Sequence, residues 1–359
     1  ILGNPPYGDI MQQSEKLLTD TYATGGINDT AAQFVERQLQ LLDDGGYFGN
    51  ITTLRLVYQS DIGEVHEEMQ DSMDTTRIAC FASRPQSVFE NAEVRVAIIT
   101  GEKTNPEHGG EILTSEFIRF DADNRDRVFS SEIPFTSVSG LELGDRIGNP
   151  QDNYSIIPKV GPEEIEEILE LLKRSSNTVF GDEMRDDETS HVVWRKRHPR
   201  YWINPYLQNI YPSGETPQDF EPMYFDSKLN CRTVFNVMQS SLFYLYWTAY
   251  GNERDLNWGQ IDAFPMPDKE KMEAHEERIV ELSDTLWTGM KRMYEAEGVI
   301  HAVEFEPIVN EIDELVGELY GLDDEAVAFL KRYHAEYGRG LDDGDSASLS
   351  EFIDTEHGN

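Results

Sequence analysis

The chain has 359 residues, a hydrophobic fraction of 38% and a net charge of −38. This length leaves room for two or three units that each bury a core, and no apolar run approaches the ~20 residues that a membrane span requires. Two distant cysteines, Cys80 and Cys231, argue against a disulfide framework or a thiolate metal site and fit a reducing cytoplasm.

The negative charge is spread along the whole chain. A field of this sign repels polyanions such as DNA. Adaptation to a cytoplasm of molar salt is the alternative interpretation, and it removes most of the repulsion because the Debye length falls to about 3 Å. We favour this halophilic interpretation. It leaves nucleic acid open as a partner, bound through close contacts more than through counterion release.

The first seven residues, Ile1-Leu2-Gly3-Asn4-Pro5-Pro6-Tyr7, predict a strand end followed by a rigid loop. The two prolines fix φ and remove two backbone donors. A carboxamide, carbonyl acceptors and an aromatic ring remain, a set that suits a flat amine-bearing group. An ordinary proline-rich turn is the alternative. Because the chain opens inside a predicted strand and has no initiator Met, we expect a fragment or the downstream part of a larger protein.

Alternating helices and strands are predicted after this loop. Asn28 or Asp29 is placed to cap a helix. The predicted helices cover 11–22, 31–42 and 62–73, and the predicted strands cover 47–52, 76–81 and 94–100. This order is typical of the second half of a doubly wound α/β sheet with a closing hairpin. The loop at Asn4 then lies at the carboxyl edge of the sheet, where such sheets bind ligands.

The pattern changes from about residue 105. Strands are predicted at 111–120, 127–135 and 191–194, separated by polar loops. Helical spacing of apolar residues is found at 162–172, 279–293 and 312–319, with Asp323 as a possible cap of a further helix. The dense aromatic run at 241–250 favours a buried helix over a ligand surface. The last residues are acidic and poor in core formers, which favours a loose tail.

A basic and aromatic run at 194–202 stands out in so acidic a chain. Its cations are Arg195, Lys196, Arg197 and Arg200, and their mixture with aromatics suits contact with phosphates and bases. The alternative is local pairing with acids at 186–188.

No metal or nuclease site is indicated. The acidic group at 121–132 lacks the glycine of a calcium loop, since Asp126 stands in its place. The histidines are scattered, and no Pro-Asp…(Asp/Glu)-x-Lys nuclease motif is found.

These motifs resemble the adenine-specific DNA methyltransferases that depend on S-adenosylmethionine, and most closely the methylase half of the type IIG restriction-modification family. Asn4-Pro5-Pro6-Tyr7 is similar to the catalytic motif of that family. Weaker similarities lie at 34–48, 81–99, 240–244 and 312–322.

The resemblance implies a catalytic loop of Asn4, Pro5, Pro6 and Tyr7. A flipped adenine would give its two amino hydrogens to the Asn4 side-chain oxygen and the Pro5 carbonyl, stack on Tyr7 and meet Phe89 on its other side. For Phe89, a core position at a strand end is the alternative. The cofactor implied is S-adenosylmethionine, whose ligands are unknown because the family carries its glycine-rich motif upstream. The partners implied are double-stranded DNA and a missing N-terminal half or partner subunit.

We therefore expect a partial catalytic domain at 1–115, an α+β target-recognition domain at 116–267, a helical segment at 268–338 and an acidic tail at 339–359. The expected function is methylation of adenine N6 within a restriction-modification or defence system, although the chain by itself would be inactive. Two alternatives stay open. One is a non-catalytic DNA-binding or specificity remnant, and the other is an amino-group methyltransferase acting on RNA guanine or protein glutamine.

Overall fold

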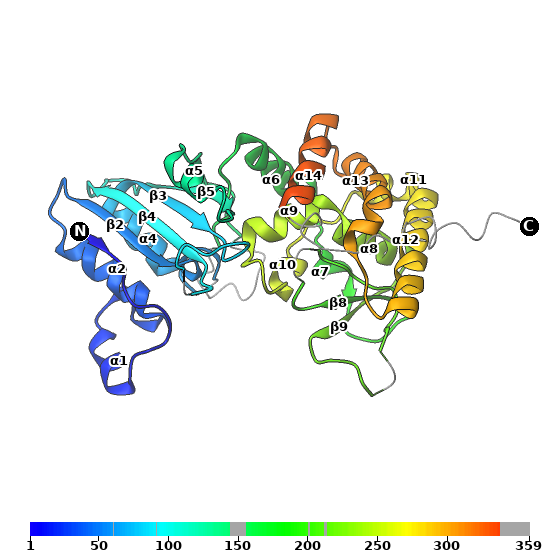
Figure 1. Ribbon diagram of the computed structural model, residues 1–359, viewed down its shortest axis with the longest axis horizontal. Helices are drawn as coiled ribbons and strands as arrows, with labels where there is room; N and C mark the ends of the chain where they lie inside the picture. Colours follow the sequence, from blue (N-terminus) through cyan, green and yellow to red (C-terminus); the bar gives the residue numbers. More distant parts are fainter. Residues whose placement is uncertain (60, 91, 144–155, 200–201, 212–213, 338–359) are drawn as a thin grey trace, which may run out of the picture. The chain divides into compact units, whose positions relative to one another are not determined.

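The computed structural model describes residues 1–59, 61–90, 92–143, 156–199, 202–211 and 214–337 (Figure 1). The chain divides into two compact units. The first contains residues 1–167 and 248–252, and the second contains residues 168–247 and 253–359.

The first unit is built on a six-stranded sheet in the order β1-β2-β4-β3-β5-β6. β1, β2, β3 and β5 run parallel, β4 runs antiparallel between β2 and β3, and β6 runs antiparallel beside β5. The carboxyl ends of the four parallel strands therefore share one edge, and β3 with β4 forms the predicted closing hairpin. This confirms the predicted α/β class. The strands are β1 (Leu2–Gly3), β2 (Tyr47–Thr53), β3 (Met73–Phe81), β4 (Val96–Lys103), β5 (Glu111–Ile118) and β6 (Thr136–Ser137).

Two amphipathic helices, α2 (Thr30–Leu41) and α4 (Gly63–Ser72), cover one face of this sheet (Figure 1). They bury apolar residues at helical spacing, among them Val35 and Leu39 of α2 and Val65 and Met69 of α4. The shorter helices α1 (Gln13–Thr19) and α3 (Arg55–Tyr58) lie in the connections. Side chains of β2 alternate between the two faces. Phe48, Asn50 and Thr52 are buried, whereas Tyr47 is 68% exposed.

The second unit combines a small antiparallel sheet, in the order β7-β9-β8, with a set of helices. The strands are β7 (Met184–Arg185), β8 (His191–Lys196) and β9 (Phe220–Phe225). The predicted helical C-terminal segment is confirmed, since Asp323 accepts a hydrogen bond from the Ala326 amide (2.8 Å) at the start of its last helix. The helices of the second half of the chain are α6 (Glu163–Ser175), α7 (Phe180–Glu183), α8 (Lys228–Gln239), α9 (Ser241–Tyr250), α10 (Trp258–Asp262), α11 (Lys269–Ala274), α12 (Glu276–Glu297), α13 (Glu306–Tyr320) and α14 (Asp324–Tyr337).

One predicted strand is wrong. Residues 127–130 of the expected strand at 127–135 lie in helix α5 (Arg125–Ser130). Asp121 accepts hydrogen bonds from the amides of Asp123 and Asn124, each 2.9 Å long, and this turn starts the helix. Phe129 then stacks on Phe81 with ring centroids 5.2 Å apart. Residues 121–130 of the acidic group that lacks the calcium-loop glycine thus form a turn and the helix that follows it.

The predicted domain boundary at about residue 115 falls within β5, which pairs in parallel with β3. β9 and α8 had no counterpart among the predicted elements. The expected acidic tail at 339–359 lies outside the described residues. Within the described parts of the chain, no helix has the length and apolar character needed to cross a bilayer.

Candidate active site

The predicted catalytic loop leaves the sheet at the carboxyl end of β1. Gly3 lies opposite Asn50 of β2. A Cβ atom on Gly3 would lie 2.5 Å from the Asn50 Oδ1 and 2.8 Å from the Gln38 Nε2, so a larger residue would force these side chains to move. Glycine thus allows β1 to lie directly against β2, and Asn4 follows at the edge where ligands of such sheets bind.

The far side of the loop is fixed to the start of α2 by one buried carboxylate. Asp29, only 2% exposed, accepts hydrogen bonds from the Ala31 amide (3.1 Å) and the Gly8 amide (3.0 Å). The Gly8 carbonyl accepts in turn from the amide and hydroxyl of Thr30, at 3.1 and 2.9 Å. Asp29 therefore caps the helix, as one of the two predicted candidates, and also holds the loop. The sequence predicts the capping role of Asp29, whereas nothing in it indicates that Asp29 also holds the loop.

Asn4 and Tyr7 lie beside each other at the tip of the loop. The Asn4 side chain is exposed, Pro5 is buried, Pro6 is exposed and the Tyr7 ring is half-buried. The Tyr7 hydroxyl donates to the Asn4 Oδ1, and the Ile51 carbonyl oxygen lies 3.3 Å from the same hydroxyl. Burial raises the pKa of the Tyr7 phenol, which keeps it a proton donor at neutral pH. The carboxamide oxygen predicted to hold an amino group is thus accessible but already accepts one hydrogen bond.

Phe89 is half-buried and packs against a cluster that contains Ala79, Phe81, Val96 and Phe120. Ile51 packs against the same cluster. The Ile51 carbonyl contacts the Tyr7 hydroxyl, and so both predicted base-holding residues lie near Ile51, Tyr7 through this contact and Phe89 through the shared cluster. The core position considered for Phe89 describes its packing, and its role beside a base stays a prediction.

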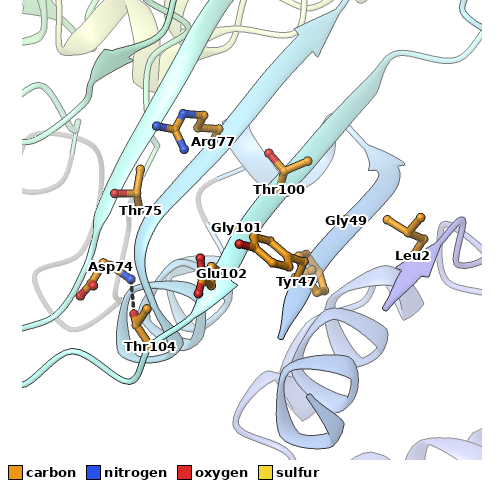
Figure 2. Close-up of a pocket in the computed structure, with 11 residues that line it drawn as sticks. Leu2, Tyr47, Gly49, Asp74, Thr75, Arg77, Thr100, Gly101, Glu102 and Thr104 are labelled. Carbon is orange, nitrogen blue, oxygen red and sulfur yellow. Dashed lines mark hydrogen bonds between the residues drawn. The ribbon is translucent and has the colours of Figure 1, made fainter. Parts of the chain in front are cut away.

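A pocket of about 530 Å³ lies on the sheet toward the opposite, amino ends of β2 and β3 (Figure 2). Tyr47 and Leu2, which is 88% exposed, lie on one side, and Asp74 and Arg77 lie on the other. A hydrogen bond with Glu102 raises the pKa of the Tyr47 phenol. This position separates the pocket from the loop at Asn4, so the two features are distinct.

The cations of the basic run differ in how far they are buried. Arg195 is 2% exposed, forms an ion pair of 2.5 Å with Glu221 and also donates to the Leu256 carbonyl. Lys196 is half-buried, with its ammonium 5.3 Å from the centre of the Tyr206 ring. Burial lowers the pKa of both Arg195 and Lys196. Arg197 is exposed.

The alternative for this run was pairing with acids at 186–188. Arg195 does pair with an acid, but this acid is Glu221. His198 similarly lies 2.8 Å from Asp255. Arg200 lies outside the described residues. Among the described residues, no group of three or more His, Cys, Asp or Glu side chains is arranged to hold a metal ion.

Comparison with protein families gives a match at the start of the chain. Residues 1–89 match the model of the Eco57I restriction-modification methylase family. The matched segment begins at β1, contains the loop at Asn4–Tyr7 and ends at Phe89, so the predicted resemblance to restriction-modification methylases is confirmed for that segment. A comparison with curated proteins gives no match.

Solved structures of restriction and restriction-modification enzymes are among those similar to this chain. The type IIL restriction-modification enzyme MmeI in complex with DNA has 12% identity and a TM-score of 0.45, with 94% of this chain and 57% of that chain covered. The type IIG restriction endonuclease BpuSI has 11% identity and a TM-score of 0.32, with 94% of this chain and 54% of that chain covered. A modification subunit of a putative type I restriction enzyme from Vibrio vulnificus YJ016 has 14% identity and a TM-score of 0.32, with 45% of this chain and 37% of that chain covered. The chain thus spans less than two thirds of the length of each.

Proposed function

We propose that this chain supplies the base-holding half of the catalytic domain, together with the DNA-reading part, of an adenine N6 DNA methyltransferase that depends on S-adenosylmethionine. It would serve a cytoplasmic restriction-modification or defence system. The observation that carries the proposal is the exposed Asn4 carboxamide beside the Tyr7 ring, at the edge where the parallel strands β1 and β2 have their carboxyl ends. This loop lies in the segment that matches the methylase family.

The loop provides acceptors for an amino group that bears two hydrogens. The Asn4 Oδ1 would take one hydrogen and the Pro5 carbonyl the other, while Pro5 and Pro6 keep the backbone rigid. The Tyr7 hydroxyl already uses one of the two lone pairs of the Asn4 oxygen and would compete with the base for this acceptor. The Ile51 carbonyl, already 3.3 Å away, is a replacement acceptor for it. Tyr7 would then present its ring to the base without leaving an unpaired hydroxyl.

Holding both amino hydrogens makes the nitrogen a better nucleophile. Acceptors in the plane of the hydrogens concentrate the nitrogen lone pair out of that plane, toward an incoming methyl group, and fixed positioning lowers the barrier further. S-adenosylmethionine would supply that methyl group. Among the described residues, we place this cofactor only against the edge formed by the Asn4–Tyr7 loop, and we assign it no other ligand in this chain.

The sheet has a surface on which the cofactor-binding part would pack. β1 pairs with β2 along one edge, and beside it the exposed Leu2 and Tyr47 flank the pocket shown in Figure 2. Parallel sheets are normally covered on both faces. We therefore assign this surface to the missing half of the catalytic domain, supplied by the same protein or by a partner subunit.

DNA contact is assigned to the exposed member of the basic run, Arg197. The buried Arg195 and the half-buried Lys196 have partners within the protein and support the strand that carries it. Arg200 remains a proposed contact on the basis of the sequence.

The test uses the intact protein, with its cofactor-binding part present, and S-adenosylmethionine carrying a labelled methyl group. We expect label in double-stranded DNA, and its loss in Asn4→Ala, which keeps the fold because Asn4 is exposed. DNA binding by Asn4→Ala should be unchanged. Label in RNA or in protein glutamine would instead support the alternative substrates, and no transfer at all would support a non-catalytic remnant.

A further inference from the structure

Trp258 is a partly exposed aromatic residue, with 37% of its surface open to solvent, at the start of α10 in the second unit. The Arg195 guanidinium lies over its ring, 4.1 Å from the ring centre. This guanidinium is fixed by Glu221 and by the Leu256 carbonyl. The indole is therefore held on a rigid cationic support and does not need to be ordered when a ligand binds.

The exposed Arg197 is joined through its backbone to the segment that leads to Trp258. Its amide donates to the Asp219 carbonyl (2.7 Å), which continues the pairing of β8 with β9 by one residue. Its carbonyl accepts from the Leu256 amide (2.8 Å), two residues before Trp258. Arg197 directly follows β8 (His191–Lys196) and is two residues from Arg195. The charge of Arg197 also acts on Arg195, where it helps to lower the pKa.

An aromatic face beside a cation is suited to a nucleic acid. A base that has left the duplex stack can stack on the ring, and the neighbouring guanidinium can pair with a phosphate. Stacking contact loses little in concentrated salt, whereas phosphate pairing loses strength with each increase in ionic strength. A protein with a net charge of −38 gains little from phosphate contacts alone, so a stacking residue is of particular value to it.

We propose that Trp258, supported by Arg195, is a stacking platform for a nucleobase of bound DNA, and that Arg197 binds the adjacent phosphate. This inference rests on the proposed function, because it takes DNA as the partner. It adds a binding residue that lies outside the basic run, about 60 residues further along the chain.

The experiment uses the intact protein and a duplex that carries its methylation site, located beforehand by mapping methylated adenine. We expect Trp258→Ala to weaken binding by about 5- to 150-fold, the range for losing one stacked base. The slope of log affinity against log salt should stay unchanged. Arg197→Ala should reduce that slope by about one. Trp258→Phe, which keeps an aromatic face, should bind within about threefold of the wild type. Val299→Ala, which truncates another exposed apolar residue of the second unit, is the matched control and should bind as the wild type does.

A second readout does not depend on the stability of the alanine variant. Bound DNA should quench tryptophan emission in the wild type, and the Trp258→Phe protein should lose that quenching. If the protein binds DNA while Trp258→Ala binds as tightly as the wild type, or while quenching survives in Trp258→Phe, the platform is refuted and the proposed function stands. If the intact protein neither methylates nor binds DNA, the proposed function itself fails.

Discussion

The Tyr7 hydroxyl is expected to compete with the substrate. It donates to the Asn4 Oδ1, the acceptor that we assign to the amino group of the target base. Tyr7→Phe removes this donor and keeps the aromatic ring. A hydrogen bond between uncharged groups contributes about 1 kcal/mol net, so its loss should favour base binding by up to about fivefold. Transfer of the hydroxyl to Ile51 in the wild type recovers part of this energy, which makes fivefold the upper limit.

The assay is steady-state methylation of the mapped duplex by the intact enzyme. We expect Tyr7→Phe to lower the KM for DNA by about two- to fivefold and to keep kcat within about threefold. Tyr7→Ala, the comparison variant, loses the ring and with it about 1–3 kcal/mol of stacking, so its KM should rise. A KM that does not fall in Tyr7→Phe would refute the competition. A loss of kcat as severe as in Asn4→Ala would show that the hydroxyl itself is needed for the reaction.

Three further predictions concern stability. Burial lowers the pKa of His66 from 6.5 to about 4, against the effect of a 2.9 Å hydrogen bond to the Leu56 carbonyl. Because the folded pKa is the lower one, the unfolded chain takes up more protons as the pH falls below about 6.5, and stability present above that pH is lost progressively toward pH 4. Between pH 7.5 and 5.5 the wild type should lose about 1 kcal/mol more unfolding free energy than His66→Gln in urea titrations, and equal losses would contradict this account. Gly110→Ala should destabilise the fold by about 1–3 kcal/mol, since its Cβ would lie 1.7 Å from the Met73 carbonyl oxygen, whereas Gly26→Ala meets no atom within 4 Å and should be neutral in the same titrations. The melting temperature should rise between 0.15 M and 2 M KCl because salt screens repulsion within a chain of charge −38, and a flat or falling curve would argue against the halophilic interpretation.

The sheet of the first unit follows from its sequence because local signals agree there. Apolar residues recur at helical spacing in α2, and the β strands on either side are bounded by glycine pairs or polar turns. The Asn4–Tyr7 loop was found for the same reason, since its chemistry lies in four consecutive residues. The hydrogen bond that anchors this loop could not be predicted in the same way. It joins the Asp29 carboxylate to the Gly8 amide, 21 residues away, and depends on the tertiary fold.

The basic run shows what composition alone misses. Val193 and Arg195 are two residues apart on β8 and are both buried, as the period of a strand requires. That alternation was a usable sign that Arg195 would share the inner face with Val193. Its partner Glu221 and the stacked Trp258 come from distant elements and were not predictable from spacing.

The prediction of a strand in the α5 region was wrong for a different reason. Arg127–Phe135 carries residues that favour strands, but Asp121 caps a turn and Phe129 gains an aromatic partner in Phe81. Packing and capping together outweigh a weak local preference. The two signals lie in different parts of the chain, so a strand was the natural expectation from the local residues.

The central claim is that the exposed Asn4 carboxamide directs a methyl group to the amino nitrogen of adenine in DNA. It is tested most directly by nucleoside analysis of plasmid DNA from cells that express the intact protein or its Asn4→Ala variant and that lack other adenine methylases. We expect N6-methyladenine with the wild type and none with the variant. N6-methyladenine at equal levels in both, or a methylated cytosine in its place, would contradict the role that we assign to this loop.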